Sequence, residues 1–320
     1  MRGALPFLLS VFVVIAGAAM SEAQANKTES RQVVSLATAT PGGGFPVYGD
    51  AFAKTINKTD PSLDVQTRNT KGSTENVPLL EAEKVDLALV QGEVASPVFS
   101  QSKSGLRIIT AMYSTPGMFV VRADSPYRTI RDLVGKPVAF GASGSGLVIL
   151  SRLVLDGIGL DQDRDFKAIY LERAGDGPAM VLDGRAAALW GGGLGWPGFE
   201  AVSKSAGGAR FIAPTAEEIT RILSKHPFLR RLTVPAGSFT GQTLPIASVG
   251  SWSFVLARPG LPDDVAYRIA RALNRGEASL GARLAQARET TAANTLAAAP
   301  DKKLIHPGVL RYFRETGLLK

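Results

Sequence analysis

A run of three glycines near the start of the chain, within TPGGGFPVYG at residues 40–49, constrains the fold more than any other feature. An apolar run with β-branched members precedes it at 33–39 and predicts a buried strand, and apolar residues at helical spacing follow it at 47–56. Three consecutive glycines carry a large backbone-entropy cost, so a chain tolerates them where its backbone approaches another group closely. That group is either a ligand or a closely packed helix and strand.

A second turn of the same kind, KGSTEN, lies at residues 71–76. It follows an alternating segment at 63–67 that predicts a strand, and its Ser73 or Thr74 is placed to cap a helix. A further strand is predicted at 85–90, and the resulting β-α-β-α-β order predicts a parallel sheet. Both turns then lie at one edge of the sheet, where two helix N-termini favour a small anion or zwitterion.

The second half of the chain, from residue 118, repeats this organisation. A strand predicted at 138–140 is followed by the glycine turn GASGSG at 141–146 and by a helical stripe of apolar residues. The glycine spacing differs from that of a dinucleotide fingerprint, and no Walker lysine and serine follow. Three interpretations stay open: capture of an anion or polar ligand by backbone N–H groups with the Ser143 and Ser145 hydroxyls, a nucleotide site, or a structural tight turn.

Trp190 ends a predicted strand and opens the glycine-rich segment WGGGLGWP at 190–197. Two tryptophans beside flexible backbone favour either a ligand wall or packing between the two halves of the chain. The two histidines, His226 and His306, lie far apart and each precedes a proline, so a surface or capping role is expected rather than a metal site.

Few reactive groups are available in this composition. The chain has no cysteine, which excludes disulfides, thiolate metal sites and cysteine nucleophiles. The G-x-S-x-G elbow of serine hydrolases and a paired-carboxylate motif are also absent from the sequence. We therefore expect no catalytic residue, no metal site and no cofactor.

The first 25 residues have the pattern of a secretory signal peptide: Arg2, an apolar run at 5–20 and a cleavage-like AQA at 23–25. A retained membrane anchor is the alternative, but the apolar run is short for a full span. The net charge is +8 and the basic residues are scattered, which argues against nucleic-acid binding. Because a lipoprotein anchor needs a cysteine, we expect a cleaved, untethered protein in a bacterial periplasm.

Motifs along nearly the whole mature chain resemble the TAXI-family solute receptors of TRAP transporters. Besides the first two glycine turns, they are VDLALVQ at 85–91, AMY at 111–113, DLVGK at 132–136, GASGSG at 141–146, PDDVAY at 262–267 and HPG at 306–308. The chain departs from the family pattern at Phe45, where the family often has tyrosine, and at Ala186 or Ala187, where it usually has aspartate. These departures bear on the identity of the ligand more than on the fold.

The resemblance implies an α/β protein with the type II periplasmic binding protein fold, in which two α/β lobes surround a central cleft. We expect a signal peptide at 1–25, lobe I at 26–117 and 248–320, and lobe II at 118–247. Such a receptor is not an enzyme. It captures a small anionic or zwitterionic solute, carboxylate or amino-acid-like, and delivers it to the integral membrane subunits of a TRAP permease. An ABC permease or a sensor kinase is the alternative partner, and an exported enzyme is the remaining alternative function.

The residues and the resemblance together predict a ligand site in the cleft. Its members are turn glycines, residues with hydroxyl or amide groups, and aromatic residues: Gly43, Gly44, Phe45, Gly72, Ser73, Asn76, Gln91, Tyr113, Ser143, Ser145, Gly146 and Trp190. Helix N-termini after Gly44, Gly72 and Ser145 are expected to hold the anionic group through backbone donors. The lobes are expected to close by a hinge motion across the two crossings between them.

Overall fold

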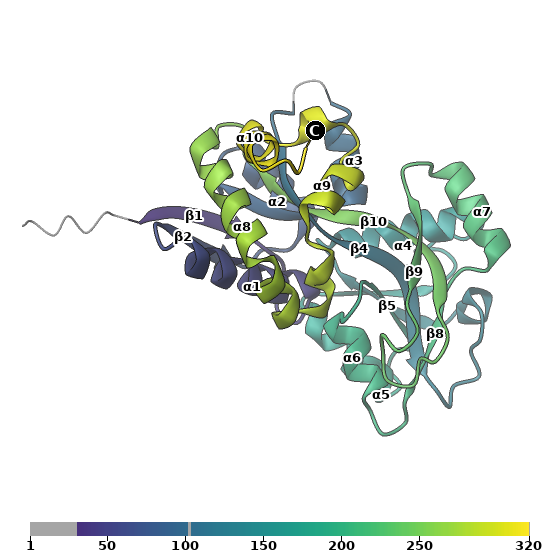
Figure 1. The fold of residues 1–320 in the computed structure, drawn as a ribbon. Coiled ribbons are helices and arrows are strands. Elements are labelled where there is room, and N and C mark those ends of the chain that lie inside the picture. The colour runs from purple at the N-terminus through teal and green to yellow at the C-terminus, as the bar shows by residue number, and fades with distance from the viewer. Residues whose placement is uncertain (1–30, 102–103, 320) are drawn as a thin grey trace, which may run out of the picture. The chain divides into compact units, whose positions relative to one another are not determined.

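The computed structural model describes residues 31–101 and 104–319 (Figure 1). The predicted signal peptide at 1–25 lies outside the described residues. Strands and helices alternate through the first half in the order β1 (Gln32–Ala37), α1 (Gly44–Thr59), β2 (Leu63–Arg68), α2 (Ser73–Glu81), β3 (Leu87–Gln91), α3 (Gly92–Phe99), β4 (Arg107–Arg122), a 3-10 turn (Ile130–Leu133), β5 (Pro137–Ala142) and α4 (Gly146–Gly157).

The second half continues with shorter elements and ends in helices. They are β6 (Lys167–Leu171), a 3-10 turn (Ala174–Asp176), α5 (Gly177–Leu182), β7 (Ala188–Gly192), α6 (Pro197–Ser203), β8 (Ala209–Ile212), α7 (Ala216–Lys225), β9 (Arg230–Val234), β10 (Ile246–Ala257), α8 (Asp263–Arg283), a 3-10 turn (Ala285–Glu289), α9 (Ala292–Ala298), a 3-10 turn (Lys302–Leu304) and α10 (Pro307–Glu315).

The strands form one continuous path of hydrogen-bonded neighbours, β2-β1-β3-β10-β4-β7-β5-β6, with β8 beside β4 and β9 beside β10. β1 is parallel to β2 and to β3, which confirms the parallel β-α-β-α-β unit predicted for the start of the chain. In the second half β5 is parallel to β6 and β7. Each half is therefore a parallel unit, and antiparallel strands join the two.

The joining strands, β4 and β10, are longer than local pattern indicates. The apolar runs at 118–121 and 254–256 predict only short strands, but β4 starts at Arg107 and β10 at Ile246. Its first part pairs with β10 in an antiparallel ladder, and its last part, Gly117 to Arg122, pairs with β7 and β8. β10 likewise continues from β3 and β4 to β9. Figure 1 shows these two strands running through the middle of the described residues.

Buried apolar side chains form two separate clusters. One is built from residues between 34 and 113 and between 254 and 313, and the other from residues between 118 and 249. Two hydrophobic cores joined by two strands constitute the two-lobe α/β fold that the resemblance implies. We keep the names lobe I and lobe II for the parts on either side of the predicted boundaries at 117/118 and 247/248, which stay a prediction.

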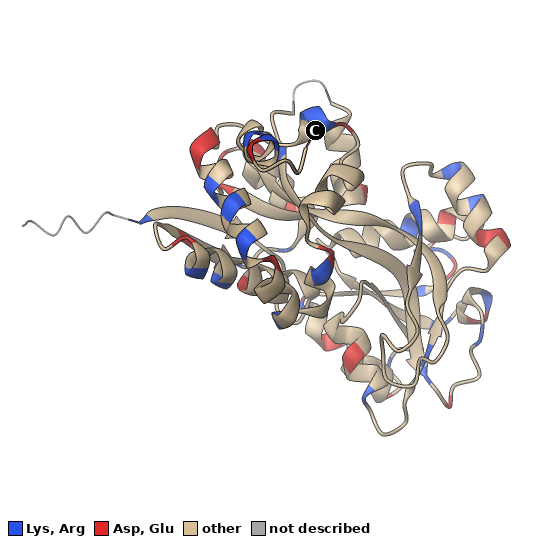
Figure 2. Ribbon diagram, in the orientation of Figure 1, with Lys and Arg blue, Asp and Glu red and all other residues tan. Residues whose placement is uncertain are grey.

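Charged residues lie mostly on the helices and loops, and the strands carry few of them (Figure 2). This distribution leaves the strand ends, where the predicted glycine turns lie, largely free of charge. Among the helices that the structure describes, none is both long enough and apolar enough to cross a membrane.

Glu93, in the first turn of α3, is an exception to the apolar interior of lobe I. It is only 3% exposed, and the Ser251 hydroxyl of β10 donates a hydrogen bond to its Oε2. Its Oε1 has no hydrogen-bond partner among the described residues. Burial raises the pKa of Glu93 to about 7, because the charged form loses its hydration without gaining a cation.

The substitution Glu93→Gln is expected to abolish the part of the pH dependence of the free energy of unfolding that comes from this carboxyl group. The folded pKa lies above the ordinary value of 4.5, so the stabilising contribution of the neutral acid is fully present below the ordinary pKa and is lost as the pH rises through 7. At about 1.4 kcal/mol per pKa unit, the loss between about pH 5 and about pH 8 amounts to roughly 2–3 kcal/mol. Urea unfolding of both proteins at these two pH values measures it, and equal pH dependence in the two would contradict the assignment.

Candidate functional site

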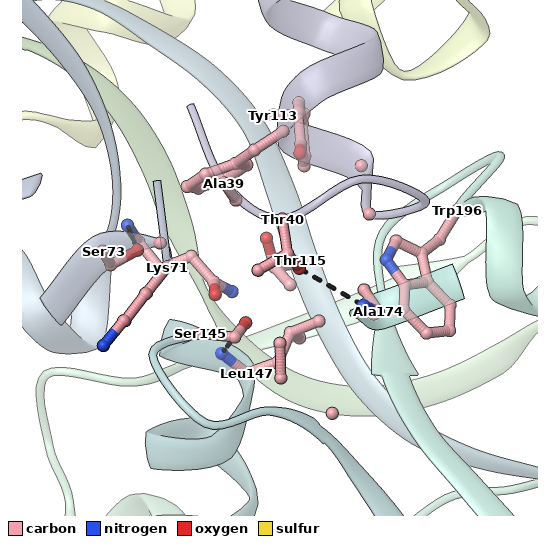
Figure 3. A pocket seen from close by; sticks show the side chains of 18 residues that line it. Ala39, Thr40, Lys71, Ser73, Tyr113, Thr115, Ser145, Leu147, Ala174 and Trp196 are labelled. Atoms are coloured by element: carbon pink, nitrogen blue, oxygen red, sulfur yellow. Dashed lines mark hydrogen bonds between the residues drawn. The ribbon is translucent and has the colours of Figure 1, made fainter. Parts of the chain in front are cut away.

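A cavity lies between lobe I and lobe II and contains about 550 Å³ of space free of atoms, counted together with its opening to solvent. Its walls are the ends of strands and the starts of helices from both lobes. Figure 3 shows Tyr113 and Thr40 on one wall, Ser145 and Leu147 on another, and Trp196 facing them from a third.

Eight of the twelve residues predicted for the site line this cavity. They are Gly43, Gly44, Phe45, Gly72, Ser73, Gln91, Tyr113 and Ser145. These residues come from the start of α1, the start of α2, the end of β3, the middle of β4 and the cap of α4. The three predicted glycine turns thus meet at one place in the structure, although they are far apart in the sequence.

Asn76, also predicted for the site, is buried behind it and does not line the cavity. Its amide nitrogen donates to the carbonyl oxygens of Thr38 and Leu89, both at 2.8 Å, and its Oδ1 accepts from the Thr70 hydroxyl at 2.7 Å. These bonds tie α2 to the ends of β1 and β3, so Asn76 positions the second glycine turn instead of facing a ligand.

Ser143 and Gly146 belong to the third glycine turn but are absent from the cavity wall. Ser143 is exposed, and its backbone N–H donates to the Leu171 carbonyl. Gly146 packs against Gln91, because a Cβ placed on Gly146 would lie 2.6 Å from Gln91 Oε1. The missing side chain of Gly146 therefore allows the amide of Gln91 to approach the N-terminus of α4.

Trp190 was expected either at a ligand wall or between the lobes, and its position favours neither. It is fully buried in the core of lobe II, packs edge-on against Phe119, and donates from Nε1 to the Leu147 carbonyl at 2.8 Å. The second tryptophan of the same segment, Trp196, lines the cavity instead. The change of direction in the glycine-rich segment after β7 brings Trp196, not Trp190, to the site.

One of the helices that begin at the cavity, α2, is capped differently from expectation. α2 has Gly72 as its N-cap and no side-chain cap, so the predicted capping by Ser73 or Thr74 is wrong. Ser73 Oγ instead accepts from the Gln91 backbone N–H at 3.1 Å, which joins α2 to the end of β3. α1 also lacks a side-chain cap, whereas Ser145 Oγ caps α4 by accepting from the Leu147 N–H at 3.2 Å.

Several backbone donors at these helix ends remain free. Within the described residues, no hydrogen-bond partner is found for the N–H groups of Gly44, Phe45, Ser73 and Gly146. They lie in the first turns of α1, α2 and α4, where the aligned peptide dipoles give each helix end a partial positive charge. Three such ends around one cavity can hold an anionic group without a counter-ion from a side chain.

The hydroxyl of Tyr113 adds a neutral donor to this cavity. Burial raises the pKa of Tyr113 far above its ordinary value, and the neighbouring Tyr48 contributes to the same shift. The phenol therefore stays protonated at any physiological pH and can donate a hydrogen bond. The Ser73 hydroxyl can donate as well, because it acts only as an acceptor from Gln91.

Gln286 lies beside this wall, and no sequence pattern pointed to it. It is 1% exposed, and neither atom of its amide has a hydrogen-bond partner among the described residues. A Cβ placed on Gly44 would lie 3.3 Å from Tyr113 Oη and 3.8 Å from Gln286 Nε2. Gln286 stands on the 3-10 turn between α8 and α9. The alanine-rich composition of residues 275–299 predicts a helix, so the approach of Gln286 to Gly44 depends on the break between α8 and α9.

The two lobes touch directly at the mouth of the cavity. The Thr74 hydroxyl donates to the Gly144 carbonyl at 3.0 Å, and the Ala174 N–H donates to Thr40 Oγ1 at 3.2 Å. Gly42 and Gly175 pack backbone against backbone, since a Cβ on Gly42 would lie 2.4 Å from Gly175 Cα. Glycine at these contacts lets the lobes approach more closely than side chains would permit.

The histidines lie outside the cavity. His306 caps α10: its Nδ1 accepts from the Gly308 N–H and its Nε2 donates to the Leu261 carbonyl. His226 contacts Asp156 on lobe II. Among the described residues, no group of three or more histidine, cysteine, aspartate or glutamate side chains is arranged to hold a metal ion.

Solved structures with low sequence identity share this fold. The periplasmic binding protein BugD has a TM-score of 0.56 at 14% identity and covers 89% of this chain and 98% of its own. A protein from Bordetella bronchiseptica RB50 gives 0.56 at 14% identity, with 90% and 99% covered. A TctC solute-binding protein from Polaromonas gives 0.50 at 19% identity, with 91% and 100% covered. At these identities the likeness is one of fold.

The sequence itself matches a family model over most of its length. The model describes the NMT1-like family, and the match runs from residue 36 to residue 317, which includes both lobes and every residue that lines the cavity. The chain therefore belongs to the NMT1-like family.

Proposed function

We propose that this protein is a solute receptor that binds a small anionic or zwitterionic organic molecule in the cavity between its lobes. The observation that carries the proposal is the set of free backbone N–H groups of Gly44, Phe45 and Ser73 on the cavity wall, at the N-termini of α1 and α2, with the N-terminus of α4 reaching the same cavity through its cap Ser145. Helix N-termini with free donors bind carboxylates and similar anions. The hydroxyls of Ser73 and Tyr113 and the amide of Gln91 would orient the rest of the ligand.

Binding would be coupled to closure of the lobes. With the predicted lobe boundaries, the chain crosses between the lobes near residue 117 on β4 and near residue 248 on β10. A hinge motion would bend the chain at these two crossings. The direct contacts at the cavity mouth then belong to the closed state, and opening separates Thr74 from Gly144 and Gly42 from Gly175. A hinge at two neighbouring strands allows this movement without disturbing either core.

The partner and the location are proposed from the TAXI resemblance. We place the mature protein in the bacterial periplasm, after cleavage of a signal peptide at 1–25, where it would deliver its solute to the membrane subunits of a TRAP permease. Two proteins that share the fold are described as a periplasmic binding protein and a solute-binding protein, which agrees with a receptor. An ABC permease or a sensor kinase is the alternative partner, and a neighbouring gene for a large fused permease would favour the TRAP assignment.

We propose binding without catalysis. The residues that line the cavity include no histidine, aspartate or glutamate among those the structure describes, and such groups are the usual acids and bases of hydrolytic chemistry. An exported enzyme with this fold is the competing hypothesis. A ligand recovered chemically unchanged after prolonged incubation with the protein would argue against it.

The proposal is tested by isothermal titration calorimetry on mature protein that has been unfolded and refolded to remove any ligand retained during purification. The panel comprises mono- and dicarboxylates, sulfonates, amino acids, neutral sugars and organic cations, together with any small molecule that mass spectrometry finds in the purified protein. We expect at least one anion or zwitterion to bind with one molecule per chain. Binding of sugars or cations alone would refute the proposal.

A further inference from the structure

We infer that the ligand of this cavity is an organic anion without an ammonium group, and that an apolar body adjoins its anionic group. The inference rests on the proposed function and narrows it, since the receptor could otherwise hold either an anion or a zwitterion. Its basis is the balance of charges and polar atoms on the cavity wall.

The cavity wall offers no carboxylate to an ammonium group. Among the described residues that line it, none is aspartate or glutamate, and Lys71 is the single one with a charged side chain. The N-termini of α1, α2 and α4, which reach the cavity through Gly44, Ser73 and Ser145, add three partial positive charges. A cationic group buried there would lose its hydration and meet positive charge, which is unfavourable unless a carboxylate compensates it.

Two buried carboxyl groups of lobe I, Glu289 and Glu93, are already engaged elsewhere. Glu289 accepts from both the backbone N–H and the hydroxyl of Ser114, at 2.6 and 3.0 Å, and it does not line the cavity. Burial raises the pKa of Glu289, and the bonds from Ser114 partly offset this shift. Glu93 is likewise bonded to Ser251 and outside the cavity wall. Neither residue supplies the negative charge that an amino-acid ligand requires.

The neutral groups on the wall indicate what accompanies the anion. Phe45, Leu147 and Trp196 present apolar surface, together with the small residues Ala39, Ala142 and Ala174. Each methylene group of a ligand buried against such surface strengthens binding by about fourfold. The amide of Gln91 and the Tyr113 hydroxyl can satisfy an uncharged polar group, such as a hydroxyl or carbonyl, on that body.

One alternative is a zwitterion whose ammonium group lies against an aromatic ring, because the faces of tryptophan and tyrosine attract cations. This cation–π attraction is smaller than the cost of burying an ammonium group that has no carboxylate partner and faces three positive helix ends. A zwitterion that bound through an aromatic face would therefore still bind less tightly than the same molecule without its ammonium group. This difference between matched ligands is directly measurable.

The test compares matched pairs by calorimetry on the refolded mature protein. Each pair is an α-amino acid and the acid of the same skeleton without the amino group: leucine and 4-methylpentanoate, valine and 3-methylbutanoate, glutamate and pentanedioate. If the tightest ligand of the wider panel belongs to none of these pairs, it is compared with its own α-amino or deaminated counterpart. We expect the member without ammonium to bind at least about tenfold more tightly in every pair that binds.

The outcomes separate this inference from the proposed function. If the tightest ligand is an amino acid, and removal of its amino group weakens binding, the inference is overturned while the receptor function stands. If no anion or zwitterion in the panel binds, the proposed function itself fails. Tighter binding of the acid without ammonium supports both.

Discussion

Replacement of Gly42 by alanine is expected to weaken ligand binding at least about tenfold, because it prevents the lobes from closing. A Cβ at this position would lie 2.4 Å from Gly175 Cα and 2.6 Å from its backbone nitrogen. Both neighbouring atoms belong to the backbone, so no side chain can rotate away, and the closed state loses population relative to the open one. Calorimetric titration with the tightest ligand of the wild-type protein measures the effect.

Gly184→Ala is a matched control for the backbone strain that accompanies this change. Gly42 and Gly184 have the same φ of +83°, a conformation that disfavours side chains, but a Cβ on Gly184 would meet no atom within 4 Å. Both substitutions should therefore lower the free energy of unfolding by about 1–2 kcal/mol, and only Gly42→Ala should weaken binding. Equal affinities in the two variants would mean that the contact between Gly42 and Gly175 plays no part in ligand capture.

Ser73→Leu is expected to reduce affinity by about 100-fold or more while the protein remains folded. Ser73 is 1% exposed, stands in the first turn of α2 and lines the cavity. A leucine side chain there would occupy the space of the ligand and would remove both the hydroxyl and its bond to the Gln91 N–H. Calorimetry measures the loss of affinity, and urea unfolding monitors the fold.

The control for this prediction is Ser143→Leu, on the turn that precedes α4. Ser143 was predicted for the site on the same grounds as Ser73, but it is exposed and does not line the cavity. Its substitution should leave affinity within about twofold of the wild type. If Ser73→Leu binds as tightly as the wild type, or if both variants lose binding equally, the cavity is not the ligand site.

Local patterns in the sequence were sufficient to predict the parallel unit of lobe I. The strand at 33–39, the glycine turn and the following helix are each determined by neighbouring residues, so propensity and periodicity identify them. Thr129 and Asp132 are another local pattern of this kind: they form a reciprocal capping box, although the segment continues only as a short 3-10 turn. The convergence of the first two glycine turns followed from the rule that parallel strands end at one sheet edge, whereas the third turn was expected at the cleft from the two-lobe fold that the resemblance implies.

Features that depend on distant contacts were not predictable in this way. The length of β4 is set by its successive partners β10, β7 and β8, none of which is adjacent in the sequence. Gln286 comes to lie beside Gly44 of the cavity wall only because the chain returns to lobe I after β10. By contrast, α7 carried a usable signal that was overlooked, the capping box between Thr215 and Glu218.

The same distinction applies to the tryptophans of the segment after β7. The glycine content of this segment indicated an unusual turn beside two large aromatic residues. The structure contains such a turn directly after β7. Which of the two faces the cavity depends on the turn between Gly193 and Gly195, both with positive φ, which directs Trp196 toward Gly44. No pattern in the sequence distinguishes Trp196 from Trp190, so the choice required the three-dimensional arrangement.

The central claim is that free backbone N–H groups at the N-termini of α1 and α2, with the N-terminus of α4 beside them, hold the ligand, and amide-resolved NMR titration tests it most directly. On addition of the tightest ligand, the account predicts that the amide protons of Gly44, Phe45 and Ser73 move downfield more than others, because each would gain a hydrogen bond to an anionic oxygen. A saturating titration in which these three amides stay unchanged, while the largest shifts appear elsewhere on the protein, would contradict the account.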